Sequence, residues 1–439
     1  MRKMMLWLVA LTTLSVSTLC AQDIAGTWQG TLQAGKGLRT VLNISAAEKG
    51  GWTAMFYSID QGPDGIAVSS ISLQGSAMKF SIAMIQGSYQ GELSADGKSI
   101  SGTWTQSGTS FPLNFQRATK ETAWSLDTSP HTVQFITVDK DVKLEVLDWG
   151  GTGRPVVLLA GLGNTAHVFD QFAPKLMASY HVYGITRRGF GASSAPAPIA
   201  RNYSADRLGD DVLAVIAALK LNRPVLVGHS IAGEELSSIG SRYPEKVAGL
   251  IYLDAGYGYA YYDRSRGDLT IDSLDLRKNL DQLIAMPGPR ALKPVVQETL
   301  QTSLPRIQKD LQELQKELQT LPDKSPAATT TPETPQMPRA AQAIIDGEEK
   351  YTEIKCPVLA IFAVPHNFGP MFKEDPAERT VAETMDLDRT TAQSAAFQAG
   401  VPSARVVRLP HANHYVFKSN EADVLRELKA FIDGLPPAT

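Results

Sequence analysis

The sequence predicts two folded parts: a small all-β barrel or sandwich, followed by an α/β domain with a mostly parallel sheet. Three observations support this fold class. Short segments before residue 118 alternate apolar and polar residues. After residue 132, continuous apolar runs are separated by helical patterns, and one long helical insertion interrupts them. With 439 residues, 43% of them hydrophobic, the chain can bury large cores in more than one domain.

The first residues have the order of a secretory signal. Two basic residues precede an apolar run, and the small residue Ala21 follows it. We therefore predict that residues 1–21 are a signal peptide and that the mature protein is periplasmic or secreted. A membrane anchor is less favoured, because hydroxyl residues interrupt the run. Cys20 also suggests an alternative, anchoring as a lipoprotein, but the preceding residue, Leu19, is large for such a site.

Charge and cysteine content narrow the possible partners. The net charge of −3 comes from 42 basic and 45 acidic residues spread along the chain, so no basic face predicts nucleic-acid binding. Once Cys20 is removed with the signal, Cys356 is the only cysteine, and no intramolecular disulfide can form. Cys356 precedes an apolar run, which is typical of a buried, unreactive thiol.

Residues 22–118 form the predicted all-β domain. Gly-rich or Asp-Gly turns separate its short alternating segments. The similar segments "GTWQG" and "GTWTQ", near its two ends, are expected to pair as first and last strands. The region resembles lipocalin-like domains that precede some bacterial hydrolases. We favour a packed accessory module over a ligand-binding barrel, since small barrels are only just wide enough for side chains or one small ligand.

The α/β domain is expected to comprise residues 119–256 and 353–439, with a helical cap insertion at 257–352. A hairpin is predicted around residues 139–141, and the later apolar runs predict parallel strands covered on both faces. Within the cap, one helix has apolar residues at a period of 3.5: Leu300, Leu304, Ile307, Leu311, Leu314 and Leu318. We expect it to pack on neighbouring cap helices rather than to dimerise. The sequence leaves the oligomeric state open.

The stretch "PVLVGHSIAGEE" places a lone serine, Ser230, at a corner between a buried strand and a helix. Gly228 and Ala232 are small residues two positions before and after it. This arrangement is typical of a nucleophile elbow, where the turn lifts the hydroxyl clear of the sheet and small flanking residues avoid a clash. The strand on one side and the helix on the other strengthen an otherwise weak motif.

A serine hydroxyl needs a base to take its proton, so a histidine is expected further along the chain. The segment "LPHANHYVF" supplies His411 and His414 after the last predicted strand. It resembles the catalytic-histidine loop of the α/β-hydrolase superfamily, which points to His414, with His411 as the alternative. The resemblance covers residues 132–435 and implies the α/β-hydrolase fold.

Two further loops resemble the same superfamily. The segment "LLAGLGNTAHVFD" occupies the place of the oxyanion hole, whose donors would be the backbone amides of Leu162 and of Ile231. Its Gly161 lets the backbone approach a substrate closely. In "TRRGFGASS", Thr186 stands where the superfamily often has Asp, and we interpret this loop as a structural turn braced by Arg188.

The sequence offers two candidates for the acid of the triad. The superfamily usually carries it after the seventh strand, but "IFAVPHNFGP" contains no carboxylate there. Asp254 ends the predicted sixth strand, where some members carry the acid, and we favour it over Asp375. A carboxylate at this position could orient the imidazole and stabilise its charged form.

The resemblance therefore implies a serine hydrolase that cleaves the carboxylic ester of a small or medium apolar substrate. Ser230 would be the nucleophile, His414 the base and Asp254 the acid. We expect no metal or organic cofactor, because the seven histidines are too scattered in sequence for a convincing zinc site. Residues 256–263, "GYGYAYYD", are either an aromatic pocket wall or cap-hinge packing. The alternative function is a ligand-binding protein that uses the β domain beside a degenerate hydrolase scaffold.

Overall fold

The computed structural model describes residues 23–33, 37–47, 50–60, 65–106, 109–124, 129–285, 288–319, 337–369 and 376–437. The predicted signal segment with Cys20, and the alternative acid Asp375, lie outside the described residues. The chain divides into two compact units, Met1–Leu126 and Asp127–Thr439.

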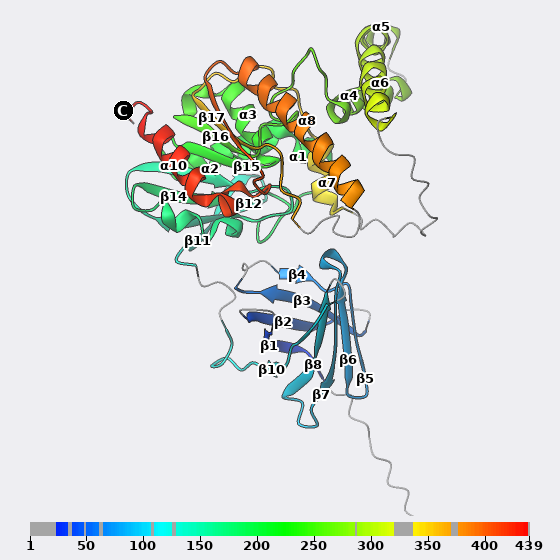
Figure 1. Cartoon of the computed structure of the whole chain (residues 1–439), viewed down its shortest axis with the longest axis vertical. Helices are drawn as coiled ribbons and strands as arrows, with labels where there is room; N and C mark the ends of the chain where they lie inside the picture. The colour runs from blue at the N-terminus through cyan, green and yellow to red at the C-terminus, as the bar shows by residue number, and fades with distance from the viewer. Residues whose placement is uncertain are drawn as a thin grey trace, which may run out of the picture. The chain divides into compact units, whose positions relative to one another are not determined.

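The first unit is an antiparallel sheet of ten strands in the order β4-β3-β2-β1-β10-β8-β7-β6-β5, with β9 paired to β8 (Figure 1). Its elements are β1 (Gly26–Leu32), β2 (Leu38–Ala46), β3 (Trp52–Ser58), β4 (Gly65–Ala67), β5 (Ser70–Gln74), β6 (Ala77–Ile82), η1 (Ala83–Ile85), β7 (Gly87–Leu93), β8 (Ser99–Gln106), β9 (Thr109–Pro112) and β10 (Phe115–Arg117). One aromatic-rich face forms the core, with Trp28, Trp104 and Phe115 almost completely buried.

The expected pairing of "GTWQG" with "GTWTQ" is wrong. These segments are β1 and β8, and β10 lies between them, paired to both. The reason is that β10 has only three residues, too few for an alternating pattern to announce it as a strand. The lipocalin-like character of this unit stays a prediction.

The second unit contains an eight-stranded sheet in the order β11-β12-β14-β13-β15-β16-β17-β18. β11 and β12 form the predicted hairpin, β12 pairs with β14 antiparallel, and every later pair is parallel. The strands are β11 (Thr132–Asp139), β12 (Val142–Gly150), β13 (Arg154–Leu159), β14 (Tyr180–Ile185), β15 (Val225–His229), β16 (Gly249–Leu253), β17 (Val358–Ala363) and β18 (Ala404–Leu409).

Helices cover both faces of this sheet, as the continuous apolar strands predicted. One core cluster joins the sheet to η2, η3, α9 and α10, and a second cluster joins it to α2, α3 and α8. The helices outside the cap are η2 (Ala166–Phe169), η3 (Ala173–Lys175), α1 (Ala200–Tyr203), α2 (Ala205–Ala218), α3 (Ala232–Arg242), η4 (Pro244–Lys246), α8 (Pro376–Gly400), α9 (Val416–Ser419) and α10 (Glu421–Asp433). Cys356 is a buried free cysteine in the second cluster, as expected.

The insertion between β16 and β17 is helical. It contains α4 (Leu269–Ile284), α5 (Pro289–Glu298), the π-helical turn η5 (Thr299–Ser303), α6 (Leu304–Gln319) and α7 (Arg339–Ile345). The expected 3.5-residue seam is interrupted, because η5 shifts the helical phase before α6 begins. α6 contacts α4, yet Leu300, Leu304 and Leu311 are exposed, so the seam is only partly buried.

Across the described part of the chain, the helices are too short or too polar for any of them to cross a bilayer.

Candidate active site

Ser230 lies on a sharp turn between β15 and α3. Its φ of +55° is in the left-handed region, which is uncommon for a residue with a side chain and is found at strained functional turns. A Cβ on Gly228 would lie 2.9 Å from the Leu236 side chain and 3.2 Å from that of Ala232. The small residues around the serine are therefore required by close strand-to-helix packing, as the elbow motif predicted.

The predicted oxyanion loop lies directly against this turn. A Cβ on Gly161 would be 3.1 Å from the Cβ of Ser230 and 2.8 Å from Nδ1 of His229. Leu162 follows Gly161, and Ile231 follows the serine at the start of α3; both side chains pack in one apolar cluster. The loop is braced from beneath by Arg187, which donates to the Ala160 carbonyl at 3.0 Å and pairs with buried Glu235. The two predicted amide donors are thus close to the serine.

Asp254 follows β16 and is completely buried. The backbone amide of Ser230 donates to the carbonyl of Leu253, the residue before Asp254. The serine and the aspartate therefore lie at the ends of adjacent strands. The Oδ1 atom of Asp254 accepts from the Tyr257 hydroxyl at 2.8 Å and from the Ala363 amide at 2.9 Å. These donors fix the orientation of a carboxylate that the sequence could only place near the site.

Two histidines share the Oδ2 atom of Asp254. His414 Nδ1 and His366 Nε2 each lie 2.6 Å from it. Burial pushes the pKa of Asp254 upward, but the hydrogen bonds and charges of the two histidines outweigh burial and hold the pKa below its ordinary value. The aspartate is therefore ionised.

His414 lies in the loop after β18, with its side chain 40% exposed. His229, the residue before Ser230, donates from Nε2 to the His414 carbonyl at 3.1 Å, and the two rings are 4.7 Å apart. Burial, followed by the charge of His414, lowers the pKa of His229 to about 3, so His229 stays neutral. The alternative base, His411, is exposed in the turn that follows β18. It is not part of the group formed by Asp254, His366 and His414.

His366 occupies the position after β17 where the superfamily usually has its acid. Its Nδ1 atom lies 2.9 Å from Asp386 Oδ1, and its backbone amide donates to Asp386 Oδ2 at 2.7 Å. Burial lowers the pKa of His366, but hydrogen bonds with Asp254 and Asp386 raise it overall to about 9. A charged imidazolium therefore stands between the two carboxylates at neutral pH. Sequence analysis did not single out Asp386, which lies within α8.

The tyrosine-rich segment 256–263 lies against the predicted triad. Tyr257 donates to Asp254, and Tyr259 packs in one apolar cluster with Ile231, the residue after Ser230. Burial is the main reason that the pKa of Tyr259 is raised, with the charge of Asp254 next, so Tyr259 stays protonated. The two interpretations offered from sequence, an aromatic pocket wall and cap-hinge packing, both stay predictions.

Two buried glutamates near the cluster were missed by sequence analysis. Glu234, four residues after the serine, is fully buried and neither of its oxygens has a hydrogen-bond partner. Burial, with Glu235 and Glu348 next, raises its pKa well above the ordinary value. Burial also raises the pKa of Glu348 to about 8. Both groups are therefore uncharged acids at neutral pH, which no local pattern could reveal.

Comparison with known proteins places this arrangement in a family. The sequence model of the alpha/beta hydrolase family matches residues 156–427, more than half of the chain. The chain belongs to the alpha/beta hydrolase family. The fold class expected from sequence is thereby confirmed for the second unit, which we call the hydrolase unit.

Individual relatives cover less of the hydrolase unit. The chain is 32% identical to fluoroacetate dehalogenase from a Burkholderia species over 116 residues, 26% of this chain and 38% of that protein. It is 25% identical over 104 residues to 2-(acetamidomethylene)succinate hydrolase from Mesorhizobium japonicum, 24% of this chain and 36% of that protein. The chain thus spans less than two fifths of the length of these relatives. A solved structure of E-2-(acetamidomethylene)succinate hydrolase covers 69% of this chain and 100% of its own, with 18% identity and a TM-score of 0.43.

Proposed function

We propose that this alpha/beta hydrolase is a serine hydrolase that cleaves the carboxylic ester of a small or medium apolar substrate. The observation that carries the proposal is the 2.6 Å contact between His414 Nδ1 and the buried carboxylate of Asp254, beside a serine on a left-handed turn. An imidazole oriented in this way can take a proton on its other nitrogen.

The proposed reaction proceeds through an acyl-enzyme. Ser230 Oγ attacks the ester carbonyl as its proton passes to His414 Nε2, and the amides of Leu162 and Ile231 bind the oxyanion. His414 then gives that proton to the leaving alkoxide. A water attacks the acyl-serine, His414 takes its proton, and collapse of the second intermediate returns the proton to Ser230. Asp254 stabilises the imidazolium throughout and stays ionised.

Two features support the proposed nucleophile and the proposed apolar substrate. One relative is named as a dehalogenase, and that chemistry requires a carboxylate nucleophile where this chain has Ser230. The side chains of Leu162, Ile231 and Tyr259 belong to one apolar cluster beside the serine, which suits an apolar acyl or alkoxy group.

The proposal is tested with a chain-length series of p-nitrophenyl esters. We expect turnover by the wild-type protein and its loss, by a factor of about 10⁴ or more, in Ser230→Ala, because no other group can form the acyl-enzyme. A fluorophosphonate probe should label Ser230, as mapped by mass spectrometry. Exposed Ser179 provides a matched control: Ser179→Ala should keep full activity and full labelling.

A folded wild-type protein without turnover or label would contradict the proposal. It would leave the ligand-binding alternative, in which the β domain captures a ligand and the hydrolase unit is degenerate. Activity that survives in Ser230→Ala would instead require another nucleophile.

A further inference from the structure

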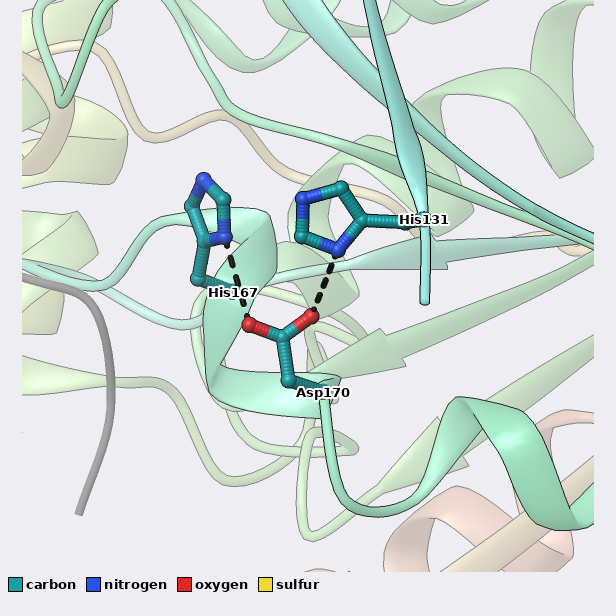
Figure 2. Close-up of side chains that lie close together, drawn as sticks. All are labelled: His131, His167 and Asp170. Carbon is teal, nitrogen blue, oxygen red and sulfur yellow. Dashed lines mark hydrogen bonds and ion pairs between the residues drawn. The ribbon is translucent and has the colours of Figure 1, made fainter. Parts of the chain in front are cut away.

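His131, His167 and Asp170 form a second cluster of polar side chains outside the predicted triad (Figure 2). His131 precedes β11, His167 lies in η2, and Asp170 directly follows η2. His131 Nδ1 lies 3.0 Å from Asp170 Oδ1, and His167 Nδ1 lies 3.2 Å from Asp170 Oδ2. Their side chains are only 2%, 12% and 13% exposed. The histidines that looked scattered in sequence are therefore partly gathered by the fold.

We propose that these three side chains bind a zinc ion. Imidazole nitrogen and carboxylate oxygen are preferred zinc ligands, and the potential ligand atoms of the three residues lie within 4.8 Å of one another. Zinc holds such atoms at about 2.0–2.1 Å, so neighbouring ligands of a tetrahedral ion are about 3.3 Å apart. His131 Nδ1 and His167 Nδ1 contact different oxygens of Asp170, at 3.0 and 3.2 Å, so both separations are close to this value when Asp170 binds the ion through both oxygens. Figure 2 shows both Nδ1 atoms facing the same carboxylate.

The surroundings of His167 match those of a metal-bound imidazole. Its second nitrogen, Nε2, lies 3.5 Å from Glu145 Oε1, and Glu145 Oε2 accepts from the Thr186 hydroxyl at 2.6 Å. Metal-bound histidines usually donate their other ring N–H to a carboxylate that is itself held by hydrogen bonds. Thr186 thus orients Glu145, and Glu145 orients His167.

The surroundings of His131 are also fixed. The Trp149 indole donates to the Ser129 hydroxyl at 3.1 Å. The edge of the Trp149 ring packs against His131, with centroids 5.5 Å apart. Preorganised ligands lower the cost of binding, because little side-chain freedom is lost when the ion enters.

Protons are the competitor for this site. In the metal-free chain the Nδ1 protons of both histidines can be donated to Asp170, which satisfies the cluster without an ion. Zinc would replace those protons on Nδ1 and leave the contact between His167 Nε2 and Glu145 in place. The ion would then tie the residue before β11 to η2, which follows the oxyanion loop, and would act as a structural brace.

The test uses the full chain stripped with chelator, reloaded with one equivalent of zinc and desalted. We expect about one zinc per chain by elemental mass spectrometry and a rise in Tm of about 4 °C or more over the stripped protein. The His131→Gln/His167→Gln variant should lose both the retained zinc and the zinc-induced rise. Because each variant is compared with itself, a lower Tm without zinc does not affect this result.

Two controls separate this site from others. Asp254, His366 and His414 could also hold an ion, so His366→Gln/His414→Gln should still retain the zinc. His181→Gln, which removes a partly exposed histidine paired with Asp148, should also retain it. In the wild type, bound cobalt should give the intense visible absorption of tetrahedral coordination.

Failure of the wild type to retain zinc and to change Tm would overturn the proposal. So would zinc retained undiminished by a folded His131→Gln/His167→Gln variant, since the ion would then lie elsewhere. Weak octahedral cobalt absorption would contradict binding by these buried ligands. None of these outcomes depends on esterase activity.

Discussion

At the scale of single residues, the unusual feature is the sharing of Asp254 between two histidines. Asp386, His366, Asp254 and His414 form a continuous chain of hydrogen bonds. When His366 is charged, both of its nitrogens donate, so both carboxylates are held. When it is neutral, one of the two carboxylates loses the N–H that the His366 ring donated to it. We therefore expect His366 to be a positioning residue that acts on the proposed triad through Asp254.

We expect Asp386→Asn to change the pH profile of hydrolysis. Loss of one flanking carboxylate lowers the pKa of His366 from about 9, since an opposite charge this close contributes about one unit or more. The fall in kcat that accompanies deprotonation of His366 should therefore move to lower pH by a similar amount. The measurement is kcat from pH 6 to pH 10. Asp388→Asn, an exposed change on the same helix, should leave the profile unaltered. An unchanged profile in Asp386→Asn would remove His366 from the mechanism.

Glu348 permits a prediction about stability. Burial raises its pKa from 4.5 to about 8, so between these values the folded chain holds a proton that the unfolded chain has released. The free energy of unfolding then falls by up to about 1.4 kcal/mol for each pH unit across this window. The side chain in the Glu348→Gln variant has no such proton to lose. The Tm of the variant minus the Tm of the wild type should therefore increase from pH 5 to pH 8. Exposed Glu353→Gln is the control. A Tm difference independent of pH would show that Glu348 is not held protonated.

Residue identity explains what the sequence could and could not predict here. Ser230 and His414 could be found because their flanking residues are constrained by a turn and by a loop at strand ends. Asp254 could be favoured but not decided, because strand-end aspartates are common. Asp386 and Glu234 could not be found, since each lies within a helix where only tertiary packing gives the side chain its partners or removes its solvent.

At the scale of elements, the site depends on the contact between the oxyanion loop and the elbow. β13 and β15 are parallel neighbours, so the loop after one must pass the turn after the other. Alternation of strands and helices predicted this meeting in outline. It could not predict the interruption of the cap helix by η5 or the three-residue strand β10, because short irregular elements have no periodic signal.

Gly161→Ala tests this contact. The added methyl would lie 2.8 Å from His229 Nδ1 and 3.1 Å from Ser230 Cβ, so the loop must move away from the serine. We expect kcat to fall by about 10- to 100-fold, approaching the cost of losing one oxyanion donor. Gly288→Ala adds the same methyl where no atom of the described residues, its chain neighbours aside, lies within 4 Å, and it should leave kcat unchanged. Normal kcat in Gly161→Ala would mean that the loop does not supply a donor.

At the scale of the whole molecule, each of the two units has a core of its own. The aromatic cluster of the first unit contains only residues between Ile24 and Phe115, and the clusters of the hydrolase unit begin at Ile136. A change from period-two alternation to continuous apolar runs made this division visible in the sequence. No comparable sequence pattern indicates the function of the first unit.

Separate cores predict separate function. A chain of residues 127–439 should fold and keep kcat within about threefold of the full chain, because every residue of the proposed mechanism lies within it. Calorimetry of the full chain should show two transitions, one of which matches the shorter chain. Loss of activity in a folded shorter chain would assign the first unit a part in catalysis.

The tyrosine-rich segment at the root of the cap has a consequence for engineering. Chimaeras that exchange caps between family members are naturally cut where the strand ends, immediately after Asp254. In this protein such a junction would also remove Tyr257, which donates to Asp254, and Tyr259, which packs with Ile231 beside Ser230. A donor cap joined there would alter both catalysis and selectivity, and the two effects could not be told apart. Splice points beyond Tyr262 would transfer the cap helices and leave Tyr257 and Tyr259 in place beside Asp254 and Ile231.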